Sequence, residues 1–245
     1  MILTQPEFIE LASTNSTNDA LKQFLCKASF PEFSSVRANY QTNGRGQTGN
    51  FWESEDGKNL LFSILIFPNI AADKQFYISK IVASACYNVL NKLIPELQTK
   101  WPNDLYSNNY KIGGILIENN LSGNKIRQSV IGIGININQT KFSKELPNPT
   151  SLQLITQQKH DINAIWKNIV FNIAKEKKYL DAQNFADIDK RYHKHLLGFG
   201  QNRTYIAKGK KFTGKITGTE PSGKLIIKSE NGTQSFDFKE IEFTF

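Results

Sequence analysis

The segment Gly44–Trp52 brings three glycines, one arginine and an indole together between two apolar stretches of the chain. Glycine permits backbone conformations and close approaches that a Cβ would block, so successive N–H groups can converge on a phosphate or a carboxylate. Arg45 can add a planar set of donors that binds the same oxygens in pairs. Gly-rich turns with an exposed arginine also connect hairpins, so the loop alone leaves both an anion site and a plain turn open.

A second polar group, Lys-Trp-Pro-Asn-Asp over residues 100–104, lies where we expect a strand to end. The side-chain oxygens of Asn103 and Asp104 suit a Mg²⁺ ion that also contacts phosphates. Pro-Asn-Asp is equally common in turns, so an ordinary turn stays open here.

Two later segments, Lys111–Glu118 and Ile131–Asn138, each place two glycines inside an apolar strand. Glycine weakens a strand and often marks a place where a ligand or another backbone approaches closely. Lys111 would then stand beside that ligand, and Asn136 and Asn138 share one face because strand side chains alternate. The alternative is a β-bulge with a solvated lysine.

The segment Ser16–Asp19 begins a predicted helix. A serine or threonine followed three residues later by an acid is a helix-capping signal, which explains the segment without a ligand. The same turn can also present hydroxyl and amide groups to the polar head of a ligand.

Hydrophobic periodicity predicts the elements that position these groups. Predicted strands cover about 7–13, 33–40, 60–67, 97–101, 110–119 and 126–138, and predicted helices cover about 17–27, 72–94 and 161–180. This pattern predicts an α+β fold of roughly 195 residues, in which helices cover one face of a mixed sheet. After residue 200 the pattern changes to short strands at 203–207, 211–217, 224–229, 233–238 and 240–244, which predicts a small β-barrel.

The composition excludes several classes of protein. No apolar run approaches the ~20 residues that span a bilayer, and the first residues lack the features of a signal peptide, so we expect a cytoplasmic location without membrane association. Cys26 and Cys86 lack metal-ligand or disulfide spacing, and we expect both to be buried thiols. We expect His193 and His195 to lie on a solvated surface.

The net charge is +8, from 30 basic and 22 acidic residues, which raises the question of nucleic acid. The basic residues are dispersed and do not alternate with aromatic residues as in a groove that binds single strands. A solvated surface or an acidic protein partner therefore accounts for the charge better than DNA.

Taken in order, these segments resemble those of the biotin protein ligases, over residues 1–245. The resemblance rests on Ser16-Thr17-Asn18, Gln41 with the Gly44–Trp52 loop, Lys100–Asp104, Lys111 with Gly113-Gly114, Gly134-Ile135-Asn136 and Pro149-Thr150-Ser151-Leu152. It implies the class II synthetase-like catalytic fold of biotin and lipoate ligases over residues 1–197, followed by an SH3-like β-barrel over 198–245.

The resemblance also implies a two-step reaction. Biotin and MgATP give biotinyl-5′-AMP, and a lysine of a biotin carboxyl carrier protein or domain then takes the biotinyl group. This chemistry needs no protein nucleophile, because positioning and charge stabilisation supply the rate. Whether the protein forms a homodimer is left open by the resemblance.

Individual roles follow from the resemblance. Biotin is expected to contact Ser16, Thr17, Asn18, Gln41, Gly44, Arg45, Gly46, Gln47, Lys111, Gly114 and Leu116. ATP and the adenylate are expected to contact Arg45, Gln47, Asn50, Trp52, Lys100, Asn103, Lys111 and Asn136. Lys111 and Arg45 are the expected catalytic residues, and Asp104 is the expected Mg²⁺ ligand.

Two loop positions depart from the family pattern, because many members carry arginine where Gln47 and Asn50 stand. We therefore expect this chain to release biotinyl-adenylate faster than an arginine-bearing relative. Some relatives also bind DNA through an N-terminal helix-turn-helix domain. Here the catalytic strand pattern begins within the first ten residues, so we expect no specific DNA binding.

Two other functions stay open, that of a lipoate–protein ligase and that of a non-catalytic regulator that responds to biotin. The polar residues Ser16–Asn18 and Gln41 favour a polar biotin head over the apolar dithiolane of lipoate. Lys111, Asp104 and Asn136 favour catalysis over regulation alone.

Overall fold

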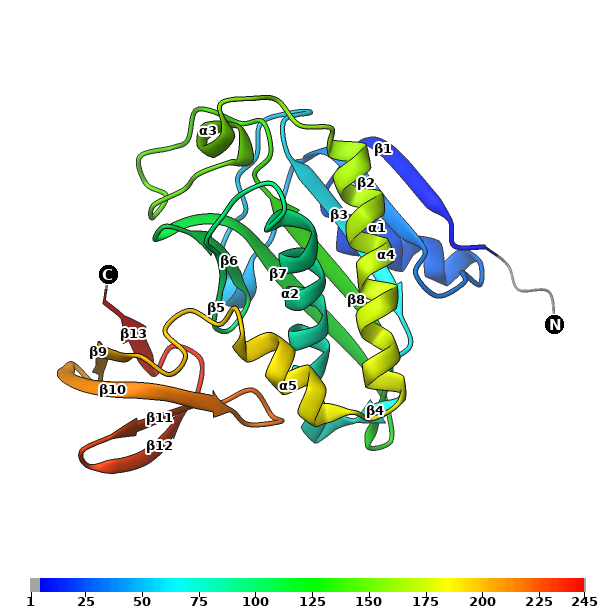
Figure 1. Ribbon diagram of the computed structural model, residues 1–245. Helices are drawn as coiled ribbons and strands as arrows, with labels where there is room; N and C mark the ends of the chain where they lie inside the picture. The colour runs from blue at the N-terminus through cyan, green and yellow to red at the C-terminus, as the bar shows by residue number, and fades with distance from the viewer. Residues whose placement is uncertain (1–4, 245) are drawn as a thin grey trace.

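The computed structural model describes residues 5–244, and within them eight strands form one mixed sheet (Figure 1). The strand order is β1-β2-β3-β8-β7-β6-β5, and β4 pairs with β8 beside this path. β1 and β2 run parallel, whereas the other pairs run antiparallel. The bounds are Phe8–Thr14 (β1), Ser35–Gln41 (β2), Leu60–Ile66 (β3), Ile70–Ala71 (β4), Leu97–Lys100 (β5), Asp104–Ser107 (β6), Tyr110–Ser122 (β7) and Lys125–Ile135 (β8).

Strand β3 is buried at every position because both faces of the sheet are covered. Phe62 and Ile64 belong to the larger apolar core, whereas Leu65 faces a smaller core with Leu21 and Val130. The alternation follows from the pleat of the strand, which turns successive side chains to opposite faces. A near-continuous apolar run is the sequence signature of such a doubly covered strand.

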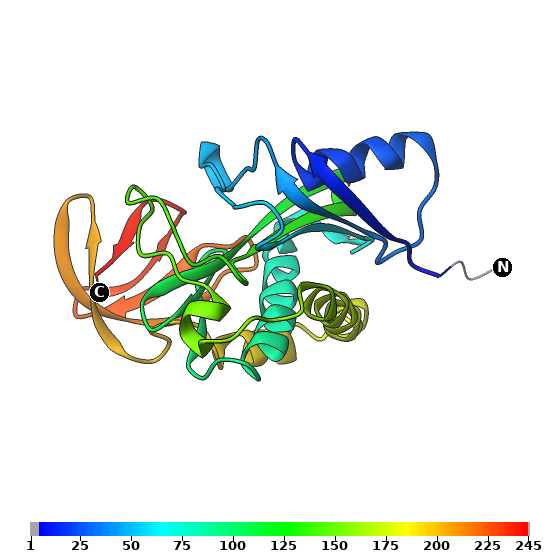
Figure 2. The ribbon, with the colours of Figure 1, turned by 90° about the horizontal axis from the view of Figure 1, so that it is seen from above.

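Helix α1 (Thr17–Lys27) covers the face with the smaller core, and three helices cover the other face (Figure 2). These three are α2 (Phe76–Leu90), α4 (Ile162–Asp181) and α5 (Phe185–His193). The prediction that helices cover one face is therefore wrong for α1, since β3 needs cover on both faces. In the region between residues 5 and 244, no helix is both long enough and apolar enough to cross a membrane.

The described C-terminal residues form a second, five-stranded antiparallel sheet in the order β12-β11-β10-β9-β13. Its strands are β9 (Asn202–Ala207), β10 (Lys210–Thr219), β11 (Leu225–Ser229), β12 (Gly232–Phe236) and β13 (Ile241–Phe243). The predicted small β unit is present, but its described strand order is open instead of a closed barrel. Four of the five residues of β12 are exposed, so this edge strand has little apolar surface to bury against β13.

The two sheets are joined by hydrogen bonds and by a shared core. Trp101 Nε1 donates to Gly223 O at 2.8 Å, and Phe76 N donates to Pro221 O at 3.1 Å. Tyr205 and Ile216 of the second sheet belong to the same apolar cluster as α2 and α4. The C-terminal sheet is therefore fixed beside the ends of β5 and β6, where it can form one wall of a site. The exact boundary after residue 197 stays a prediction.

Two predictions about single side chains are wrong. Cys26 is exposed near the end of α1, although Cys86 is buried in α2 as expected. His195 is buried, with Nε2 3.1 Å from Ser84 Oγ and Nδ1 2.9 Å from Thr99 Oγ1. It follows α5 directly, where the chain turns inward against α2 and β5, and burial lowers its pKa to about 3.

Candidate active site

A cavity of about 470 Å³ lies over β7 and β8 on the face that α1 covers. The register places Gly114 opposite Gly134, Leu116 opposite Gly132, and Glu118 opposite Val130, which contacts α1. The cavity is lined by most of the predicted site residues, namely Ser16, Thr17, Asn18, Gln41, Arg45, Gly46, Gln47, Asn50, Trp52, Lys100, Asn103, Asp104, Lys111, Gly114 and Leu116. Gly44 and Asn136, which were also predicted, are not among its lining residues.

The strand glycines form the floor of this cavity because other side chains lie directly on them. A Cβ at Gly132 would stand 2.6 Å from Asn18 Oδ1, and one at Gly134 would stand 2.7 Å from the indole of Trp52. Trp52 also lies 3.5 Å from the Cβ position of Gly114. The glycines therefore mark close approaches, as the sequence predicts, and the groups that approach are Asn18 and Trp52.

The Gly-rich loop is folded back on itself. Gly46 N donates to Asn50 O at 2.7 Å, and Trp52 N donates to Gly44 O at 3.0 Å. Gly44 must lack a Cβ, because that atom would stand 2.4 Å from Trp52 O. These N–H groups are used within the loop and do not point at a common anion. The segment is therefore a turn closed by its own backbone, as one of the two alternatives predicts, and it also forms a wall of the cavity.

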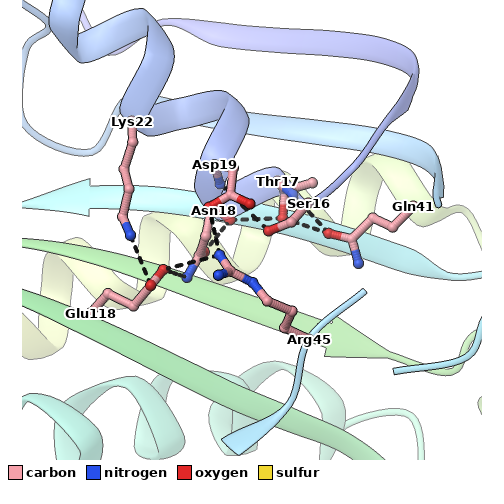
Figure 3. Close-up of polar contacts among 9 residues, drawn as sticks. Ser16, Thr17, Asn18, Asp19, Lys22, Gln41, Arg45 and Glu118 are labelled. Atoms are coloured by element: carbon pink, nitrogen blue, oxygen red, sulfur yellow. Dashed lines mark hydrogen bonds and ion pairs between the residues drawn. The ribbon is translucent and has the colours of Figure 1, made fainter. Parts of the chain in front are cut away.

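The start of α1 holds a continuous polar network (Figure 3). Ser16 caps the helix, and Thr17 donates to Gln41 Oε1 through its backbone N at 2.8 Å and through Oγ1 at 3.1 Å. Asn18 Nδ2 donates to Glu118 Oε2 at 2.5 Å. The capping signal is therefore confirmed, and the residues of the same turn line the cavity.

Two members of this network were missed by sequence reasoning. Ser63 Oγ lies 2.7 Å from Thr17 Oγ1 and 2.5 Å from Asn18 Oδ1, so it links both side chains from β3. Glu118 receives hydrogen bonds from Asn18 and Lys22. The available signals were a lone hydroxyl inside the apolar run of residues 60–67 and a lone acid at the end of the glycine-bearing strand.

Glu118 is ionised in this setting. Partial burial raises the pKa of its carboxyl, but the hydrogen bonds from Lys22 and Asn18 and the charges of Lys22 and Arg45 outweigh burial and lower the pKa below its usual value. Glu118 itself does not line the cavity, but its negative charge lies directly behind Asn18, which does.

A second charged pair lies where β6 meets β7. Lys111 Nζ stands 2.8 Å from Asp104 Oδ1, and both side chains are partly exposed to the cavity. The backbone of Lys111 is held from the other side by Asn148 O at 2.7 Å and Thr150 N at 2.9 Å. This explains why the segment from Pro149 to Leu152 accompanies the lysine: it fixes the first residues of β7.

Lys100 lies near the same pair but in more apolar surroundings. Its Nζ is 4.9 Å from the ring centroid of Tyr106 and 5.4 Å from that of Phe243 on β13. Burial lowers the pKa of Lys100, and the carboxylate of Asp104 opposes this shift. The C-terminal sheet therefore contributes to the cationic end of the cavity.

Asn103 and Asn136, both predicted to contact the nucleotide, form hydrogen bonds with backbone groups. Asn103 Nδ2 donates to Ile115 O and Asn103 O accepts from Ile115 N, both at 2.9 Å. Asn136 Nδ2 donates to Thr150 O at 2.9 Å, and Asn136 is not among the residues that line the cavity. Asn136 Oδ1 is buried and has no hydrogen-bond partner among the described residues.

Arg45 lies away from Lys111, at the α1 end of the cavity. Its Nη2 is 2.6 Å from Asp19 Oδ1 and 3.8 Å from Glu118 Oε2. Lys111 and Glu118 are seven positions apart on β7, so their backbones are about 23 Å apart along an extended strand, and the Lys111 side chain reaches back only as far as Gly114. The structure therefore does not join the two predicted catalytic cations at one point.

The residues present can hold Mg²⁺ only with help from a ligand. Over the part of the chain that the structure describes, no cluster of three or more His, Cys, Asp or Glu side chains could hold a metal ion. Asp104 provides one carboxylate at the cationic end of the cavity. That donor set fits a Mg²⁺ ion that takes its remaining ligands from phosphates and water.

Comparisons with known proteins give one answer. The model of the Biotin/lipoate A/B protein ligase family matches residues 10–136. The Bifunctional ligase/repressor BirA of Bacillus spizizenii is 31% identical over 219 residues, which cover 86% of this chain and 66% of that protein, so the chain spans about two thirds of that relative. The biotin--[acetyl-CoA-carboxylase] ligase of Paracoccus denitrificans is 28% identical and is covered to 99%, with 95% of this chain. The biotin protein ligase from Aquifex aeolicus, in complex with biotin and ATP, superposes with a TM-score of 0.78 at 26% identity, covering 97% of this chain and 99% of that one.

Proposed function

We propose that this chain, which belongs to the biotin/lipoate A/B protein ligase family, is a biotin protein ligase. In the first step the carboxylate of biotin attacks the α-phosphorus of ATP, and pyrophosphate leaves. In the second step the amine of an acceptor lysine attacks the acyl carbon, AMP leaves, and the amine gives up a proton as the amide forms.

The observation that carries this proposal is the polar network at the start of α1. A ureido group offers one carbonyl acceptor and two N–H donors, so its pocket needs fixed groups of both kinds. Because Thr17 occupies Gln41 Oε1, the Gln41 amide is oriented and presents Nε2 as a donor. The Ser16 hydroxyl can donate, whereas the Thr17 hydroxyl gives its proton to Gln41 Oε1 and can only accept. A dithiolane ring would leave these groups without partners, which disfavours lipoate.

The other end of the cavity suits the reacting carboxylate and the phosphates. Lys111 and Lys100 supply positive charge there, and Lys111 can stabilise the negative charge that develops on the carboxylate and phosphate oxygens. A bound Mg²⁺ would neutralise phosphate charge, and Asp104 is the residue that would hold it. Asp104 would then exchange its contact with Lys111 for one with the metal.

Different observations support nucleotide contacts by Trp52 and by Asn136. Trp52 lies on the Gly114–Gly134 pair and offers an aromatic face at the cavity wall, which suits stacking by adenine. For Asn136 the support is its buried Oδ1, an acceptor that could serve an amino group of the base. Gly44 acts through the loop backbone, because it lies outside the cavity lining.

The acceptor in this proposal is the lysine of a biotin carboxyl carrier domain; the name of the Paracoccus denitrificans relative gives acetyl-CoA-carboxylase as the acceptor of that protein. The net charge of +8 would favour an acidic acceptor surface. We also propose that the protein acts in the cytoplasm, without specific DNA or membrane binding; a homodimer is compatible with this function.

The test is pyrophosphate release in the presence of MgATP and one of two acids. Biotin should support release and lipoate should not. Release with lipoate alone would identify a lipoate ligase, and binding of biotin without any release would identify a non-catalytic regulator.

A further inference from the structure

Arg45 is held by an acidic residue of helix α1. Its guanidinium lies between the carboxylates of Asp19 and Glu118, at 2.6 Å and 3.8 Å (Figure 3). The two Glu118 oxygens are already engaged, one by Lys22 at 2.7 Å and the other by Asn18 at 2.5 Å. Asp19 is therefore the main partner of Arg45.

The pair connects the two walls of the cavity. Asp19 belongs to the first turn of α1, directly after the residues of the polar network, whereas Arg45 belongs to the Gly-rich loop. The loop is otherwise folded on itself through Gly44, Gly46 and their partners. The ion pair is thus a specific link from the side chains of this loop to the helix.

The pair also sets where the cation can act. In this position Arg45 stands beside Glu118, which is seven positions along β7 from Lys111, whose side chain reaches back over Gly114. An anion that lies beside Lys111 can gain full pairing with Arg45 only if the arginine leaves Asp19. A carboxylate and an anionic ligand therefore compete for one guanidinium.

We propose that Asp19 is a positioning residue that holds Arg45, and with it the loop, against α1, and that the anionic adenylate must displace it. The proposal rests on the proposed function, because it concerns the affinity of the same site for biotinyl-5′-AMP. It predicts that Asp19 weakens retention of the intermediate and adds to the effect of the neutral side chains at Gln47 and Asn50. The pair is partly exposed, so its effect is modest and sensitive to salt.

The variant Asp19→Asn tests this with little risk to the fold, because Ser16 still caps the helix. Dissociation of biotinyl-5′-AMP should become about two- to fivefold slower, and the difference from wild type should shrink at high salt. Glu10→Gln is the matched control, since Glu10 pairs with Arg37 at the same 2.6 Å on β1 and β2 but neither residue lines the cavity. Equal or faster dissociation from Asp19→Asn would overturn the proposal.

We call the ion pair between Asp19 and Arg45 the tether. A double-mutant cycle separates the effect of the tether from a general effect of the Asp19 charge. In an Arg45→Ala background, Asp19→Asn should leave dissociation unchanged. An equal slowing in both backgrounds would show that the negative charge of Asp19 acts on the ligand directly, and the tether would be wrong.

A measurement without substrates keeps the tether separable from the proposed function. Amide hydrogen exchange over residues 44–52 should be faster in Asp19→Asn than in wild type, with neither biotin nor ATP added. Unchanged exchange would overturn the tether even if the enzyme makes the adenylate. If wild type makes no adenylate but exchange accelerates, the proposed function fails and the tether stands.

Discussion

Lys111 Nζ lies 2.8 Å from Asp104 Oδ1, on neighbouring strands whose register places Asp104 opposite Gly114. The pair puts a cation and a carboxylate at the end of the cavity that is lined by Lys100 and the C-terminal sheet. A carboxylate that releases the lysine to bind metal would let both groups serve a nucleotide at once. This arrangement makes Lys111 the first residue to test.

Lys111→Ala should reduce biotin-dependent pyrophosphate release at least tenfold and leave the fold intact. A hydrogen bond to a charged group contributes about 1.5–3 kcal/mol, which corresponds to a factor of ten or more. Lys211→Ala, an exposed lysine on β10, is the control and should keep full activity. Near-normal release from Lys111→Ala would refute its central role.

Ser63→Ala should weaken biotin binding without preventing folding. Ser63 links Thr17 to Asn18, and a lost hydrogen bond of about 0.5–1.5 kcal/mol should raise the KM for biotin about two- to tenfold. The KM for ATP should change much less, because the network lies at the other end of the cavity. Ser129→Ala removes an equally buried serine that binds Asn119 on the neighbouring strand, and it should leave both KM values unchanged. A parallel rise in both KM values would point to a general loss of structure.

Much of this fold could be predicted from hydrophobic periodicity, and β3, α2 and α4 are the clearest cases. Periodicity does not say which face a short amphipathic helix covers, so the position of α1 was missed. It also treats a polar residue inside an apolar strand as an exception, which is why Ser63 went unnoticed. The motif order brings together most of the residues that line the cavity, but the partners of Arg45 depend on where α1 and β7 meet in space.

Gln47→Arg should slow release of biotinyl-5′-AMP about tenfold, because Gln47 lines the cavity and a charged donor there can bind the phosphate. The measurement is the dissociation time of the preformed intermediate. Release from the variant that is as fast as from wild type would mean that the nucleotide is held elsewhere.

Stability should fall in acid partly because of His195. Its pKa in the folded protein is about 3, below its ordinary value of 6.5, so the unfolded chain binds a proton that the folded chain does not. The contribution of neutral His195 to the free energy of unfolding is therefore complete above pH 6.5. It is lost as the pH falls toward 3, by up to about 1.4 kcal/mol per pH unit. The Tm of wild type should drop more steeply between pH 6 and pH 4 than that of His195→Gln. Parallel curves would show that His195 does not titrate in this way.

The proposed function is the attachment of biotin to a carrier lysine through an adenylate. The most direct measurement is the intact mass of a biotin carboxyl carrier domain after incubation with the protein, MgATP and biotin. We expect the addition of one biotinyl group. The addition should depend on ATP, and it should be absent when the acceptor lysine is replaced by arginine or when lipoate replaces biotin. An unmodified carrier domain together with no biotin-dependent pyrophosphate release, or modification by lipoate instead of biotin, would contradict it.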